Sequence, residues 1–149
     1  MKRVLVVLVA ALTVVGVAYA AAKPPILAQP LALGRVANTQ SVTIAKGSKL
    51  VFVRVTVQPG GSFGWHVHHS AVAVAIISGT LSLYDSSDPN CAAQLVKAGQ
   101  GFVESVNHVH LARNDGKTPV HLMVTYLGVP QGKSLDAPAA QPAQCSAVK

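Results

Sequence analysis

Hydrophobic positions after residue 40 come in short runs that turn-forming residues interrupt. Residues 50–57 are rich in β-branched side chains, residues 72–77 form a continuous apolar run, and residues 81–84 alternate between apolar and polar side chains. Shorter apolar runs lie at residues 42–44, 94–96, 102–103, 109–111 and 120–127. Pro59-Gly60-Gly61 and Asn114-Asp115-Gly116 are typical turn sequences between them. Because strands recur about every ten residues and no window has a helical period, the pattern predicts an all-β sandwich or barrel.

The first 20 residues have the pattern of a secretory signal peptide. A basic head at residues 1–3 precedes an aliphatic stretch at residues 4–17, and Ala18-Tyr19-Ala20 is a small-x-small cleavage sequence. The alternative is an uncleaved membrane anchor, since about 19 residues can span a bilayer. The helix-breaking Lys23-Pro24-Pro25 favours cleavage. We therefore expect a periplasmic or secreted protein without stable membrane insertion, divided into a signal peptide (1–20), an N-terminal arm (21–40), one barrel domain (41–128) and a C-terminal tail (129–149).

The charge distribution argues against a nucleic-acid partner. The formal net charge is +7, and cleavage would remove Lys2 and Arg3 and leave +5. The remaining basic residues are scattered and aromatic residues make up 5% of the chain, whereas a nucleic-acid interface needs clustered positive charge. The partner expected instead is a small-molecule ligand or substrate. A homodimer through an unprotected edge strand is a further option.

The two cysteines, Cys91 and Cys145, predict a disulfide bond, because an even number of cysteines in an exported protein is commonly paired. The bond would close a loop of about 55 residues and stabilise the fold by roughly 4 kcal/mol in the chain-entropy model. Two free thiols are the alternative. Residues 131–149 are rich in Pro, Ala, Gln and Ser without apolar periodicity, which predicts an irregular tail that the bond would pin.

Three of the six histidines, His66, His68 and His69, lie within four residues. Side chains two residues apart on a strand share a face, so His66 and His68 can reach one metal ion, and His69 is expected at the surface or just outside the site. About forty residues further along, His110 lies on another apolar strand. Antiparallel folding would bring it to the same point. Three histidines with open positions are a common arrangement for a metal that binds water or substrate.

These residues resemble the two motifs of the cupin superfamily. The first motif is matched by Gly60, His66, His68 and Gly79, and the second by Gly99 or Gly101, His110 and Asn114. The resemblance covers residues 40–128 and implies a double-stranded β-helix, or jelly-roll barrel, with one metal inside. Small exported cupin-domain proteins of largely unassigned function are similar at residues 65–68, 102–104, 110–114 and at the C-terminal cysteine.

One ligand of the family pattern is missing. The glutamate of the first motif would fall at Val72 or Ala73, and neither side chain can bind a metal. Glu104 is the only glutamate in the protein and ends an apolar strand, where an isolated carboxylate is costly to bury unless it is paired or metal-bound. We expect Glu104 to be the fourth ligand or a general base. The alternatives are a rim carboxylate paired with Arg113 or a lysine, or a site completed by His108.

The function implied by the resemblance is that of an exported metal-binding cupin, either a dioxygenase or an isomerase acting on a small molecule. One divalent ion is expected at His66, His68, His110 and Glu104. Iron or manganese suits the oxidation, and zinc, nickel or copper stays open because the affinity order does not settle metal identity. The alternative is a non-catalytic barrel that binds a metal or a small apolar or sugar-like ligand, with Val72, Val74 and Ile76 lining its pocket. We expect His121 at the surface or the rim.

Overall fold

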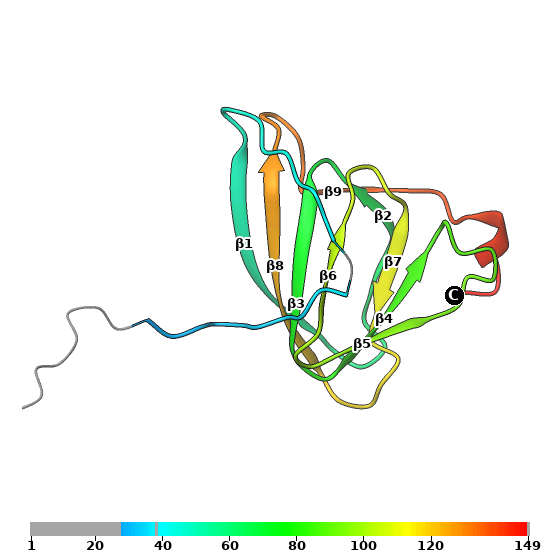
Figure 1. Ribbon diagram of the computed structural model, residues 1–149. Helices are drawn as coiled ribbons and strands as arrows, with labels where there is room; N and C mark the ends of the chain where they lie inside the picture. The colour runs from blue at the N-terminus through cyan, green and yellow to red at the C-terminus, as the bar shows by residue number, and fades with distance from the viewer. Residues whose placement is uncertain (1–27, 38, 149) are drawn as a thin grey trace, which may run out of the picture.

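The computed structural model describes residues 28–37 and 39–148, and within them the chain forms nine strands and one short 3-10 helix (Figure 1). The elements are β1 (Lys49–Val57), β2 (Ser62–His68), β3 (Ala71–Ser78), β4 (Thr80–Asp85), β5 (Gln94–Lys97), β6 (Gly101–Glu104), β7 (His110–Arg113), β8 (Val120–Val129), β9 (Asp136–Pro138) and η1 (Ala143–Cys145). None of the described helical segments is long and apolar enough to cross a bilayer. The signal peptide predicted at residues 1–20 lies outside the described residues.

The strands of this part of the chain form two antiparallel sheets that lie as two layers in Figure 1. Their orders are β1-β8-β3-β6 and β5-β4-β7-β2-β9. From β1 to β4 each strand lies in the sheet opposite to the one before it, and from β5 to β9 the alternation resumes. This winding between two layers is the jelly-roll arrangement of a double-stranded β-helix, so the predicted fold class is confirmed.

The core lies between the two sheets and is aliphatic. Val72, Val74 and Ile76 of β3 are buried and pack with Leu122 of β8 and Leu81 of β4. All three are expected to line a pocket, but of the three only Val74 lines the cavity beside the histidines. These β3 residues share one face of the strand because side chains alternate in direction. Burying a side chain of this size stabilises a fold by about 1.5 to 3 kcal/mol, so this inner layer holds the two sheets together.

Asn114 fastens the connection between β7 and β8, which belong to different sheets. Its side chain is buried, donates to the carbonyl oxygens of Val57 (2.9 Å) and Thr118 (2.8 Å), and accepts the N–H of Gly116 (2.9 Å). Buried polar side chains need such partners. The turn sequence therefore joins the layers, and its asparagine ties this connection to the end of β1.

Two local expectations are wrong. Residues 42–44 form no strand; Val42 and Ile44 are exposed, and no ladder pairs with this stretch in the described residues. The tail, expected to be irregular, contains β9, which pairs with β2, and η1. Main-chain pairing orders the tail, and the side-chain pattern carries no sign of that pairing.

The predicted disulfide is present and anchors the tail. Cys91 and Cys145 are bonded, and the cysteine pair packs with Tyr84 and Leu111 on the outer side of the second sheet. Trp65 packs against the same cluster. Figure 1 shows the C-terminal segment running from β9 to η1, beside the connection between β4 and β5. The tail therefore covers an apolar patch that the sheet would otherwise leave in water.

Replacing both cysteines, Cys91→Ala with Cys145→Ala, should lower the free energy of unfolding by about 3 to 4 kcal/mol, because the bond closes a long loop in the unfolded chain. Urea denaturation of the oxidised protein and of the double variant measures the difference. Wild-type protein under reducing conditions is the control and should behave like the variant. Superimposable unfolding curves for the oxidised protein and the variant would contradict the stabilising role of the bond.

Candidate metal centre

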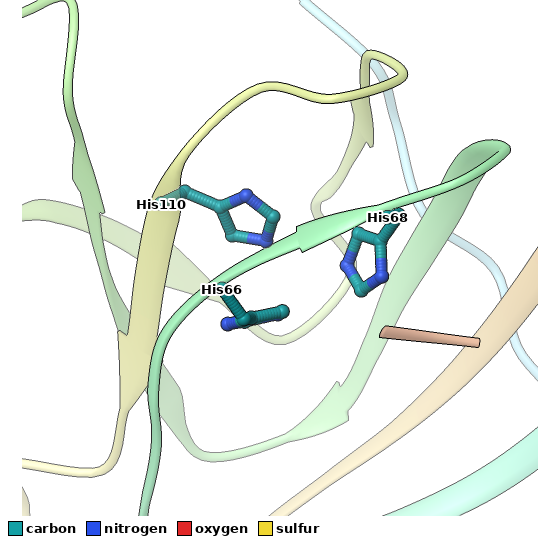
Figure 2. A group of neighbouring side chains, drawn as sticks. All are labelled: His66, His68 and His110. Atoms are coloured by element: carbon teal, nitrogen blue, oxygen red, sulfur yellow. The ribbon is translucent and has the colours of Figure 1, made fainter. Parts of the chain in front are cut away.

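Three buried histidines from two neighbouring strands come together inside the barrel. His66 and His68 lie on β2, and His110 begins β7 directly opposite His66 in the ladder. Their exposed fractions are 7%, 4% and 2%. The ring centroid of His66 is 4.3 Å from that of His110 and 4.8 Å from that of His68. One candidate ligand atom from each residue lies within 4.8 Å of the other two, and Figure 2 shows the three rings pointing into a common space.

A backbone carbonyl orients each ring. The Nδ1 atoms lie within hydrogen-bonding distance of the carbonyl oxygens of Gly64 for His66 (2.9 Å), Leu135 for His68 (3.1 Å) and His108 for His110 (2.9 Å). A carbonyl only accepts, so Nδ1 carries the proton in each pair. Nε2 is therefore the ring nitrogen that each histidine could offer to a metal once that atom carries no proton. Histidines that bind a metal through one ring nitrogen commonly donate the N–H of the other to a carbonyl or a carboxylate in the same way.

Glu104, at the end of β6, lies within this histidine cluster. Its Oε2 is 3.0 Å from Nε2 of His68, its Oε1 is 2.8 Å from Nε2 of His110, and its side chain is 9% exposed. Two ligand atoms at about 2.1 Å from one ion and at right angles to each other are about 3.0 Å apart. The spacing therefore fits donors around a shared cation. Glu104 is thus buried against histidines and does not lie at a rim, and the carboxylate that Arg113 contacts at 2.6 Å is that of Asp115.

The position of Glu104 accounts for the glutamate that the first motif lacks. Val72 of β3 is the direct ladder partner of Glu104 on β6. Directly opposed residues of an antiparallel pair project from the same face of the sheet. The carboxylate of Glu104 on β6 therefore faces the same region as the side chain of Val72 on the neighbouring strand β3, where the motif would place its glutamate.

Burial and mutual contacts set the charges of the cluster. Burial by itself raises the pKa of Glu104, but His110 and His68 outweigh it and lower the pKa to about 2. Burial likewise acts to lower the pKa of His110, but the Glu104 carboxylate outweighs it and raises that pKa above its ordinary value. Burial, together with the neighbouring His110 and His68, lowers the pKa of His66. At neutral pH the cluster therefore holds an anionic carboxylate and a neutral His66.

The remaining histidines lie away from the cluster. Nε2 of His108 contacts Oδ1 of Asp85 at 2.7 Å, so its side chain faces another partner and only its carbonyl supports His110. His121 is exposed, as predicted, and its Nδ1 is 3.0 Å from Oγ1 of Thr56. His69 is half-buried and is the first residue of the turn that follows β2. Of Glu104 and His108, the two residues expected to complete the site, Glu104 has its side chain beside the three histidines and His108 has its side chain on Asp85.

The tail and β8 contribute to the site in ways that the sequence pattern did not predict. Leu135 supplies the carbonyl that orients His68, and Leu135 and Asp136 line a cavity of about 240 Å³ beside His66 and His68. Tyr126 of β8 lines the same cavity, with its ring centroid 5.5 Å from that of His68. A backbone carbonyl leaves no sequence signal, and Tyr126 is hidden in an otherwise apolar strand.

Solved structures with the same fold include enzymes. The DMSP lyase DddQ from Ruegeria pomeroyi is 15% identical, with a TM-score of 0.53 over 65% of this chain and 46% of that one. The polyketide cyclase RemF from Streptomyces resistomycificus is 13% identical, with a TM-score of 0.52 over 70% of this chain and 73% of that one. The chain spans less than half the length of the DMSP lyases it matches. At identities this low, the likeness shows a shared fold alone.

The family is established by a sequence model together with the fold. No curated protein matches the sequence. The family model described as "Cupin domain" matches residues 53–126, a range that contains both histidine motifs. The match agrees with the jelly-roll topology and with the histidines that converge from β2 and β7. The chain belongs to the cupin superfamily.

Proposed function

We propose that this protein is an exported, metal-dependent cupin that acts on a small molecule. In this proposal one divalent ion binds to His66, His68, His110 and Glu104. The observation that carries the proposal is the convergence of three buried imidazoles, each with its Nδ1 held by a carbonyl, on a buried carboxylate. Burying these polar groups together without a shared partner would be costly.

The donor set favours iron or manganese. Imidazole suits zinc, copper, iron and nickel, whereas carboxylate oxygen suits harder ions, so a mixed set of three imidazoles and one carboxylate suits iron or manganese. Zinc, nickel or copper is the alternative. Such an ion supplies Lewis acidity or redox chemistry toward a bound molecule. Both oxygens of Glu104 contact histidine nitrogens, which supports the role of ligand over that of a free general base.

The chain's own residues would bind and orient the substrate. The cavity beside the cluster is lined mainly by aliphatic side chains, which exclude water from a bound molecule. Burial raises the pKa of Tyr126, and the charges of Asp136 and Glu104 act in the same direction. The Tyr126 hydroxyl therefore stays protonated at neutral pH and can donate a hydrogen bond. These features support binding of a small molecule beside the ion, which the proposed oxidation or isomerisation requires.

A non-catalytic ligand-binding barrel is the second candidate function, and the aliphatic lining of the cavity favours it. In that case the metal would only hold the ligand. An oxygen-consumption and product screen of the metal-loaded protein separates the two functions, because only the enzyme releases an altered molecule. For either function we propose export, and the disulfide is compatible with an oxidising compartment.

The double variant His66→Ala with His110→Ala should lose bound metal, since two of the four proposed ligands are removed. Metal analysis of protein purified without a histidine tag should find close to one ion per wild-type chain and almost none in the variant. His121→Ala removes an exposed histidine outside the cluster and is the matched control, which should retain the ion. An unchanged metal content in the double variant would show that the proposed ligands are wrong.

Glu104→Gln should weaken metal binding by at least about tenfold, because the substitution keeps the shape of the side chain but removes its charge, and losses of supporting groups alone cost about 10- to 100-fold. The metal-free variant should also show a lower pKa at His110, whose imidazolium Glu104 stabilises. Competition with a chelator measures the affinity, and an NMR titration follows the imidazole. If the metal affinity and the pKa of His110 in the variant equal those of the wild type, Glu104 is not part of the site.

Metal affinity should fall as the pH is lowered. Since the pKa of His110 is raised above 6.5, this residue retains its proton into the neutral range, and metal binding must displace it. The affinity should therefore increase as the pH rises through the pKa of His110. Dissociation constants measured from about pH 5.5 to about pH 8 test the trend, in the range where histidines titrate. A flat profile would contradict histidine ligation.

A further inference from the structure

We infer that the molecule bound by this site is small and amphipathic, with an apolar body about the size of one ring and a single oxygen-containing head that is neutral or singly charged. This inference rests on the proposed function, because the head is taken to bind at the metal. The evidence is the shape, lining and charge of the cavity between the two sheets.

The size of the cavity sets the size of the body. Its volume is about 240 Å³. A cavity of about 150 Å³ lined by similar side chains holds benzene, whereas drug-sized ligands occupy about 300 to 1,000 Å³. One ring with small substituents therefore fits.

The cavity has an apolar floor and a polar end. Leu81 and Leu122, which are 1% and 2% exposed, form part of its deep wall, and Phe63, at 46% exposed, lies at its mouth. The polar groups on its lining are His66, His68 and Glu104 of the site, with Tyr126 and Asp136 beside them. A bound molecule must therefore place its polar atoms toward the end of the cavity where these groups of β2, β6, β8 and β9 lie, and its apolar part against the aliphatic wall.

The charges of the lining limit the charge of the head. Among the described residues, no lysine or arginine lines this cavity, while Glu104 and Asp136 are both acidic. A divalent ion with Glu104 would have one net positive charge, which one anionic group balances, and Asp136 is exposed, so solvent screens its charge. A dianion would find no further cation to compensate it, and burying an uncompensated charge is costly. A neutral or singly charged head avoids that cost.

A second cavity, of about 330 Å³, offers a competing route to the site. It is more polar, and Asp85, Gln94 and His108 are among its lining residues. Glu104 lines both cavities, His110 lines only the polar one, and His66 and His68 line only the apolar one. Since two of the three imidazoles face the apolar cavity, the open side of the site is there. The two cavities predict opposite ligand preferences, which makes the choice testable.

The test uses the zinc-loaded protein, because zinc has no redox chemistry, with 4-methylcatechol and oxalate as probes in titration calorimetry. We expect 4-methylcatechol to bind more tightly than oxalate. Two variants then alter the cavity without touching a proposed ligand. Ala112→Leu adds bulk to its wall and should weaken 4-methylcatechol binding by about tenfold or more, and Val124→Ala should improve binding of the bulkier 4-tert-butylcatechol, since one methylene in such a pocket changes affinity by at least about tenfold.

Ala92→Leu makes the same substitution as Ala112→Leu on an exposed loop and is the matched control, expected to bind 4-methylcatechol like the wild type. Zinc content is measured first for every variant. Failure of the wild-type protein to retain zinc would contradict the proposed function itself. A zinc-loaded protein that prefers oxalate, or that binds the catechols equally well with either cavity variant, would overturn only the inference about the ligand.

Discussion

Burial of a carboxylate and three imidazoles in an aliphatic interior is the constraint that organises this molecule. A lone buried carboxylate would cost several kcal/mol, and removing one member of a buried pair leaves the other uncompensated. Glu104 meets this constraint through short contacts to His68 and His110. The same contacts keep it ionised despite its burial. Stability and chemistry therefore depend on the same few atoms.

The surrounding backbone makes the arrangement specific. Each imidazole has its Nδ1 bound to a carbonyl, and these carbonyls belong to β2, to the loop before β7 and to the tail. The tail reaches its position by pairing with β2 and is anchored by the disulfide on the outer side of the sheet. Residues distant along the chain thus fix the orientation of His68. The same tail that covers the outer side of the sheet also supplies a hydrogen bond to the inner site.

The winding of the chain between two sheets explains why the site can be both buried and open to ligands. Antiparallel neighbours β2 and β7 bring their histidines together, while β3 and β6 place Glu104 from the facing sheet. Between the layers, aliphatic side chains leave a cavity beside the donors. A polar site at the wall of an apolar cavity is suited to a molecule with the same division of polarity.

The sequence by itself determined most of the strands, the pairing of the histidines at positions 66 and 68, and the cysteine pair, because each depends on local spacing or on a count of two. The involvement of His110 also followed, through its motif. Tertiary structure decided what depends on register between distant strands. Only the ladder between β3 and β6 shows that Glu104 lies opposite Val72 and reaches the site. Only the contact with Asp85 shows that the His108 side chain does not reach it. The tail strand and the Leu135 carbonyl were equally undetermined, since a main-chain hydrogen bond uses atoms that every residue carries and that no side-chain pattern encodes.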